Sequence, residues 1–261
     1  MAFRPLTYLR RVARQRAARQ WQGLDAAVPR LGRARLGRLS AEARCLRATL
    51  DHFLQRADER RYLSRARLDD LDLPGGTDWR WRPEALSGVI SPTGMAAPDS
   101  GQQVGRQLRL WHDCPLAALI LRQVSNGGAT DLSPYALRLE VMGFQGSYLS
   151  LSVDMPDTAL TGLTSSHILR LETGMQVERP LDIYARLNIQ HGPNTETILR
   201  HMGNMQPGQP NRNVTEFDLA LTRMNEKRLE KIWLDLIFEA PSMNAIMLHD
   251  LFMSRHLRAD I

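Results

Sequence analysis

The feature that most constrains the fold is an alternation of apolar and polar residues that begins near residue 106. It is clearest in residues 181–190, where every second side chain is apolar: Leu181, Ile183, Ala185, Leu187 and Ile189. Successive side chains of a strand point to opposite faces of its sheet. The run therefore predicts a strand with one buried face and one solvated face.

Further runs predict seven more strands, at 116–124, 136–142, 147–155, 167–178, 214–224, 231–239 and 245–255. Because such strands have one apolar face, they are expected to form two antiparallel sheets that bury these faces against each other. No long amphipathic helix separates the runs, which disfavours a wound α/β fold. The predicted fold is mainly β, a two-sheet antiparallel jelly-roll sandwich.

The N-terminal segment has a different period, because its apolar residues recur every three or four positions. These residues are Leu6, Leu9, Val12, Ala13, Ala17, Trp21 and Leu24. This spacing predicts a helix with one apolar stripe. A second helix is predicted to begin at Ser40, whose hydroxyl suits an N-cap, and to end near Leu63. A basic α-helical arm is thus expected to precede the sandwich.

The charge of the chain divides at the end of this arm. Residues 1–67 hold 17 basic and five acidic residues, a net charge of +12, whereas residues 68–261 hold 17 basic and 23 acidic residues, a net charge of −6. We therefore divide the chain into a basic helical arm (1–67), a Pro/Gly-rich linker with a first edge segment (68–105) and a β-sandwich domain (106–261). Residues 91–105 of the linker are predicted to form a surface loop.

A basic helix with an apolar stripe suits the surface of an anionic membrane. The residues expected to make this contact are Arg10, Arg11, Arg14, Arg16, Arg19 and Trp21. The same stripe could instead pack against the acidic body of the protein or against a neighbouring protein. Nucleic acid is a less favoured partner, because the arm has few aromatic residues to stack on bases.

The sequence predicts no signal peptide and no transmembrane segment. Arginines interrupt every apolar run near the N-terminus, and no apolar stretch reaches the about 18 residues that a spanning helix needs. The expected location is the cytoplasm or the periphery of a membrane. The two cysteines, Cys45 and Cys114, are too few for a disulfide framework or a cysteine-based zinc cluster.

The sequence contains no motif of known catalytic or cofactor chemistry, such as a phosphate loop, an HExxH zinc motif or a GxSxG nucleophile turn. Asp235 and Glu239 offer two carboxylates, but four strand positions place them about 13 Å apart, which is too far for glycoside hydrolysis. We therefore predict no catalytic residue, no cofactor and no metal site. The oligomeric state is left open.

The predicted binding surface combines an outward strand row, the polar turn that follows it and two tryptophans that would stack on a sugar ring. Its residues are Trp79, Trp81, Tyr184, Arg186, Asn188, His191, Asn194 and Glu196. Structural explanations also remain open for this set. Arg186 would pair with a cross-strand acid such as Glu140 or Glu172, and the tryptophans would cover a sheet edge.

Four blocks of the sequence, in order, resemble a bacterial domain family of unknown function. They are TDWRWRPEALSG, LWHDCPLAALILRQVSN, RPLDIYARLNIQHGPNTE and EFDLALTRMNEKRLEKIWLDLIFEAPSMNAIMLHDLFMSR, and the resemblance covers roughly residues 77–258. The last two predicted strands also resemble the end of galactose-binding-like and carbohydrate-binding jelly rolls. The resemblance implies a sugar or protein ligand and carries no catalytic residues.

We therefore expect a non-enzymatic binding or adaptor protein. Its sandwich would recognise a carbohydrate or protein surface, and its basic arm would attach to an anionic membrane or partner. Two other functions remain open: a structural component of a larger protein assembly, which predicts stable oligomers, and a glycan-processing enzyme, which predicts two facing carboxylates in a cleft.

Overall fold

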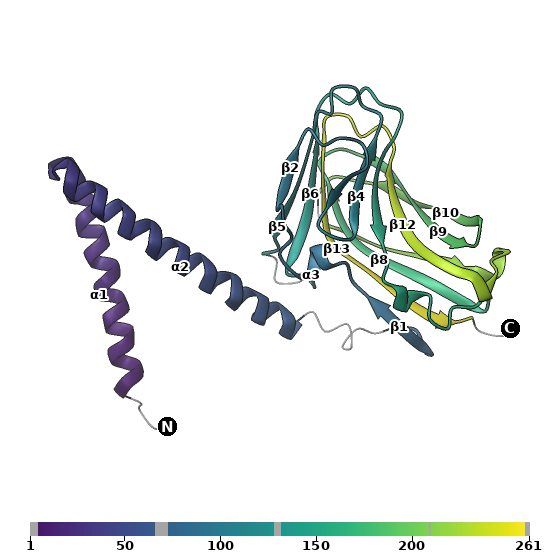
Figure 1. Cartoon of the computed structure of the whole chain (residues 1–261), viewed down its shortest axis with the longest axis horizontal. Coiled ribbons are helices and arrows are strands. Elements are labelled where there is room, and N and C mark those ends of the chain that lie inside the picture. The colour runs from purple at the N-terminus through teal and green to yellow at the C-terminus, as the bar shows by residue number, and fades with distance from the viewer. Residues whose placement is uncertain (1–4, 66–72, 128–131, 209, 259–261) are drawn as a thin grey trace. The chain divides into compact units, whose positions relative to one another are not determined.

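The computed structural model describes residues 5–65, 73–127, 132–208 and 210–258; in the first two helices the described side chains are those of residues 12–47, 49–50 and 53. The chain forms two compact units, Met1–Ala57 and Asp58–Ile261. Helix α1 (Pro5–Ala27), the 3₁₀ turn η1 (Val28–Arg30) and helix α2 (Arg33–Arg65) make up the N-terminal arm, and a mainly β body follows (Figure 1).

The prediction that the second helix begins at Ser40 is wrong, since α2 begins at Arg33 and holds Ser40 in its interior. Leu36 and Leu39 extend its apolar stripe toward the turn, where they line a small hollow together with Trp21 of α1. These contacts outweigh the local preference of Ser40 for a capping position. In the part of the chain that the structure describes, no helix is long and apolar enough to span a membrane.

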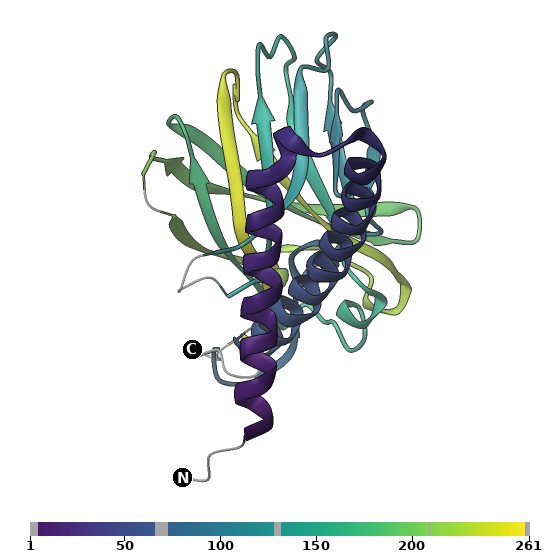
Figure 2. The same cartoon turned by 90° about the vertical axis from the view of Figure 1, so that its left-hand side faces the viewer.

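The body consists of two antiparallel sheets. Sheet A has the order β11-β8-β13-β6-β5-β2, and β1 pairs with β13; the strands are β1 (Thr77–Trp81), β2 (Gly94–Ala96), β5 (Leu119–Ser125), β6 (Tyr135–Val141), β8 (His167–Val177), β11 (Asn211–Asp218) and β13 (Asn244–Leu257). Sheet B has the order β10-β9-β12-β7-β4-β3; the strands are β3 (Gln102–Val104), β4 (Leu108–His112), β7 (Leu149–Asp154), β9 (Leu181–His191), β10 (Asn194–Met205) and β12 (Leu229–Phe238). Figure 2 turns the side with β2 and β5 toward the viewer.

The two sheets bury their apolar faces against each other, as the alternation predicts. On β8 and β9 the inward positions are buried, and Leu171 and Ile183 have no exposed surface. Burying a side chain of this size stabilises the fold by about 1.5–3 kcal/mol. All eight predicted strands are present, although several of their ends differ. The mainly β jelly-roll sandwich with a helical N-terminal arm is thereby confirmed.

Three regions contain strands that the sequence does not predict: residues 91–105, residues 108–112, which form β4, and residues 194–205, which form β10. Residues 91–105, predicted to form a surface loop, include β2 and β3, which pair with β5 and β4 at the sheet edges. β10 lies at the edge of sheet B, and its buried residues are Ile198, Met202 and Met205. Such sparse burial does not produce a period of two, so β10 is invisible to a search for alternation.

An ion pair fastens β1 to the end of the sandwich. The guanidinium of Arg255 on β13 donates to both carboxylate oxygens of Asp78 at 2.8 Å, and also to the backbone carbonyls of Ala159 and Thr161. The hydrogen bonds from Arg255 hold the pKa of Asp78 below its usual value, against the opposing effect of desolvation. The ionised form of Asp78 therefore belongs to the folded state.

Asp78→Asn is expected to lower the free energy of unfolding at neutral pH. Because folding lowers the pKa of Asp78, its contribution is present above the unfolded value of about 3.9 and is lost as the pH falls through the folded value. The stability difference between parent and variant should therefore shrink below about pH 4, as measured by urea unfolding. Asp157→Asn, at an exposed position, is the control. A difference that stays constant with pH would contradict the prediction.

Candidate functional site

A groove follows β7 on the outer face of sheet B. Between inward core residues, β7 carries two small outward side chains, Ser150 and Ser152. Trp111 of β4 lies opposite Ser150, and Asp235 of β12 lies opposite Ser152. This contrast in side-chain size leaves a hollow of about 430 Å³, which we call the β7 groove. Its lining residues are Arg109, Trp111, Tyr148, Ser150, Ser152, Asp154, Arg186, Lys231, Trp233 and Asp235.

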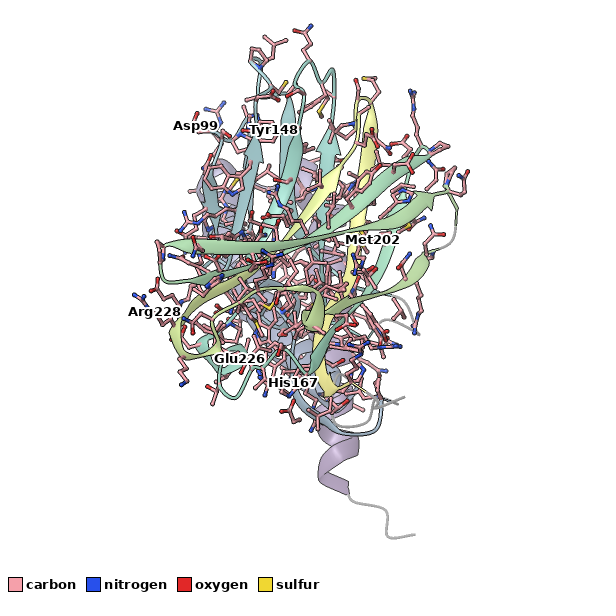
Figure 3. All side chains as sticks on the ribbon, turned by 90° about the vertical axis from the view of Figure 1, so that its right-hand side faces the viewer. Asp99, Tyr148, His167, Met202, Glu226 and Arg228 are labelled. Atoms are coloured by element: carbon pink, nitrogen blue, oxygen red, sulfur yellow. The ribbon has the colours of Figure 1, made fainter. Side chains whose placement is uncertain are left out.

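Three aromatic side chains of the β7 groove stay accessible. Trp111 is 40% exposed, Tyr148 is 43% exposed and Trp233 is half-buried. Figure 3 looks onto this side of the body, with Tyr148 toward its upper end. Rings held on strands in this way offer a ligand a large apolar surface at a small cost in side-chain entropy.

Trp111 rests against a turn that requires glycine. Gly101 has a φ of +80°, and a Cβ at this position would lie 2.8 Å from Cζ3 of the indole. Glycine alone combines this backbone conformation with such a close approach. The turn therefore supports the indole from one side and leaves the rest of the ring exposed.

Tyr148 is positioned by a carboxylate that does not line the groove. Asp113 accepts hydrogen bonds from the backbone N–H groups of Ser147 at 2.7 Å and Tyr148 at 3.1 Å, and from the hydroxyl of Ser147. These hydrogen bonds, led by that of the hydroxyl, hold the pKa of Asp113 below its usual value. A Cβ at Gly146 would collide with the same carboxylate. Asp113 therefore orders the backbone that carries the tyrosine.

The floor of the groove is a preformed polar network around Asp235, which is almost fully buried. One oxygen of its carboxylate accepts from Nε and Nη2 of Arg186 at 3.1 and 2.9 Å, and from Nδ2 of Asn188 at 2.9 Å. The other oxygen accepts from the hydroxyl of Ser152. Charge-assisted hydrogen bonds of this kind are short and strongly oriented, so the floor is rigid.

A second ion pair lies beside this network. Nζ of Lys231 is 2.9 Å from Oδ1 of Asp154, and it also lies 5.3 Å from the centroid of a Trp233 ring. Each of the two carboxylates that line the groove is thus paired with a cation. Within the described residues, no group of three or more His, Cys, Asp or Glu is placed to hold a metal ion.

Three of the predicted binding residues on β9 lie in or beside the groove. Arg186 lines it, and Asn188 supports its floor through Asp235. Tyr184 occupies the next outward position, donates a hydrogen bond to Glu239 at 3.1 Å and has its ring 4.8 Å from that of His201.

The cross-strand partner of Arg186 is Asp235 on β12. The sequence offered Glu140 or Glu172 as the acid, but both lie on strands of sheet A. The choice of partner depends on which strands become neighbours, and this relation is not encoded locally.

The other predicted residues lie away from the groove. His191 ends β9, and Asn194 and Glu196 lie at the start of β10, where Nε2 of His191 is 3.9 Å from Oε1 of Glu196. Trp79 and Trp81 lie on β1 of sheet A, with ring centroids 6.4 Å apart, and they pack against the core. The structure therefore does not bring these tryptophans to the face that carries Arg186.

Sequence reasoning did not select the aromatic residues that do line the groove. Trp233 stands at an outward position of the predicted strand 231–239, and Tyr148 stands outward in the predicted strand 147–155. Trp111 lies on β4, which was not predicted. A large aromatic residue at a solvent-facing strand position was the available signal, because monomeric proteins seldom gather such residues on an open surface.

The fold and the groove define a jelly-roll β-sandwich protein with an aromatic, charged groove on one sheet. The chain belongs to a family of unknown function, DUF6478, whose model matches residues 1–261. The resemblance to a domain family of unknown function is therefore confirmed. No curated protein matches the chain in sequence.

Several solved structures are similar to part of this chain. The CBM22-2 xylan-binding domain of Paenibacillus barcinonensis is 11% identical, with a TM-score of 0.39 over 69% of this chain and 99% of that domain. The family 11 carbohydrate-binding module of Clostridium thermocellum, in complex with a mixed-linked tetrasaccharide, is 8% identical, with a TM-score of 0.38 over 60% of this chain and 92% of the module. The match to a C. thermocellum xylanase with CBM22-1 and GH10 modules is 9% identical, with a TM-score of 0.38 over 54% of this chain and 25% of the xylanase chain.

Gly101→Ala is expected to displace the indole of Trp111 and to destabilise the body. Gly162 provides a matched control, because its φ is +71° and an added Cβ would meet nothing within 4 Å. Both substitutions carry the left-handed backbone cost of about 1–2 kcal/mol, and Gly101→Ala adds the collision with Trp111. Urea unfolding and the indole NMR resonance of Trp111 measure the difference. Equal destabilisation with an unshifted Trp111 resonance would count against this contact.

Proposed function

We propose that the β7 groove binds a carbohydrate. A sugar ring presents apolar C–H faces and hydroxyl edges, so it needs aromatic surfaces beside fixed hydrogen-bonding groups. The groove combines the two, with Trp111, Tyr148 and Trp233 around a floor built on the Arg186–Asp235 pair. This combination on one outer sheet face is the observation that carries the proposal.

The size and rigidity of the groove support this function. Its volume of about 430 Å³ falls within the range of about 300–1,000 Å³ that is common for small-ligand sites. The aromatic rings and the polar floor are already held in place by protein contacts, which lowers the entropy cost of binding. Arg186 would donate to sugar hydroxyls, while Asn188 would hold Asp235 in the orientation that accepts from them.

In this proposal the protein binds its ligand without transforming it. A glycan-processing enzyme needs carboxylates that exchange protons during the reaction. Asp235 and Asp154 are instead both engaged with cations. Recognition rather than catalysis is the chemistry that such a groove favours, in keeping with a binding or adaptor protein.

Trp111→Ala and Trp233→Ala are each expected to weaken glycan binding about five- to thirtyfold, because a lost stacking contact costs on the order of 1–2 kcal/mol. A glycan array identifies the ligand, and isothermal titration calorimetry measures the affinities. Leu199→Ala is the control, since this residue is 52% exposed on the neighbouring edge strand β10 and does not line the groove. Unchanged affinity in both tryptophan variants would refute the assignment of the ligand to this groove.

We further propose that the N-terminal arm attaches the protein to an anionic membrane surface, with the protein at the cytoplasmic side. Among the arm residues whose side chains are described, none is buried, and Leu46, Leu50 and Phe53 form an exposed stripe spaced by four and three positions. The net charge of +12 in residues 1–67 favours an anionic partner and disfavours a second, equally basic arm.

The predicted membrane-contact residues have different surroundings in the arm. Arg14, Arg16 and Arg19 are exposed on α1, which suits contact with lipid headgroups. Trp21 is half-buried and lines the hollow between α1 and α2. The side chains of Arg10 and Arg11 lie outside the described residues.

The double variant Leu50→Gln/Phe53→Gln is expected to weaken binding of the full chain to anionic vesicles about tenfold, because it removes apolar surface without changing the charge. Cosedimentation with vesicles of phosphatidylcholine, with and without phosphatidylglycerol, measures this binding. Binding should also fall as salt rises, and Leu199→Gln on the body should behave like the parent.

Failure of the parent chain to bind anionic vesicles would overturn the membrane proposal. If the parent instead formed a stable oligomer and the double variant were monomeric, the exposed stripe would be an assembly surface. The proposal of membrane attachment would then be replaced by that of a structural component of a larger protein assembly.

A further inference from the structure

The charges that line the β7 groove do not balance. Three cations, Arg109, Arg186 and Lys231, share the groove with two carboxylates, Asp154 and Asp235. Two of the cations are committed, because Arg186 pairs with Asp235 and Lys231 pairs with Asp154, each at 2.9 Å. No carboxylate of the groove remains to pair with Arg109.

No acid lies directly opposite Arg109 in the sheet. Its cross-strand neighbours are Gln103 on β3 and Ser152 on β7, and both are neutral. Among the residues that the structure describes, its guanidinium has neither a hydrogen-bond acceptor nor an ion-pair partner. The side chain is nevertheless half-buried at the groove. An unpaired guanidinium that lines a groove favours a ligand with the opposite charge.

Trp111 stands two positions further along the same face of β4, about 7 Å away along the strand. A sugar ring that stacks on this indole lies parallel to the indole plane, and its substituents extend toward the neighbouring side chains. One sugar residue is therefore able to contact the indole and to reach the guanidinium.

We propose that the β7 groove selects acidic glycans. An anionic substituent on the sugar, either a carboxylate or a sulfate, pairs with Arg109 while the ring stacks on Trp111. The planar guanidinium donates two parallel hydrogen bonds to such a group, which a neutral hydroxyl cannot match. This inference rests on the proposed carbohydrate binding and adds the charge of the ligand to it.

The test compares acidic and neutral oligosaccharides of the same backbone by isothermal titration calorimetry on the full chain. Trigalacturonate and its methyl ester form the carboxylate arm, and a sulfated galacto-oligosaccharide and its unsulfated parent form the sulfate arm. The acidic member of at least one pair is expected to bind about tenfold more tightly, as one charge-assisted contact allows. Which pair shows the preference identifies the anionic group.

Arg109→Gln is expected to abolish this preference, so that the acidic and the neutral member of the pair bind with equal affinity. Arg106→Gln is the matched control, because it removes the same charge from an exposed position between β3 and β4 that does not line the groove. Thermal unfolding verifies that both variants fold. The control also separates groove binding from attraction to the basic arm, which neither substitution alters.

The outcomes distinguish the two proposals. Equal affinity for acidic and neutral glycans would overturn the selectivity and leave carbohydrate binding intact. A preference that survives Arg109→Gln would also overturn it, since the basic arm or another surface would then be its source. If no glycan of either kind binds, carbohydrate recognition itself fails and the selectivity fails with it.

Discussion

The burial of one apolar face of each sheet against the other is the interaction on which the rest of the body depends. Leu171 of sheet A and Ile183 of sheet B have no exposed surface, because strands of both sheets cover them. Side chains alternate along a strand, so the choice of the inward set also sets the outward one. Slipping a strand by one residue would exchange the two faces. The packed core therefore holds Trp111, Ser152 and Asp235 on the outer face of sheet B.

Contrast in side-chain size turns that outer face into a site. The small side chains of Ser150 and Ser152 form the bottom of the β7 groove, and larger aromatic and charged residues of the neighbouring strands form its sides. Support comes from residues that the ligand would not touch: Gly101 behind Trp111 and Asp113 behind Tyr148. Because these side chains are already ordered in the free protein, little binding free energy is lost to ordering them when a ligand binds. Proposed recognition thus rests on backbone conformation as much as on the groove side chains.

The sequence predicted the strands with regular alternation and missed those without it. Residues 181–190 match β9 closely, because their inward positions are uniformly apolar. β10 was missed because an edge strand buries few residues and need not alternate. Arg186 and Asn188 were selected because they face outward on a regular strand, and both lie at the groove. Trp111, on the opposite side of the β7 groove, was not selected, because its strand β4 is only five residues long and follows a segment that was predicted to be a loop.

Periodicity and charge are properties of the chain before it folds, and they were enough to separate a basic helical arm from an antiparallel sandwich. Neighbour relations arise only on folding. Trp111, Ser150 and Trp233 meet because β4, β7 and β12 lie side by side in sheet B, although long segments separate them in the chain. The entropy cost of closing a loop rises only slowly with its length, so distance along the chain does not dictate which strands pair. Collective packing of the core makes that choice, and the groove, its ion pairs and the surplus charge of Arg109 follow from it.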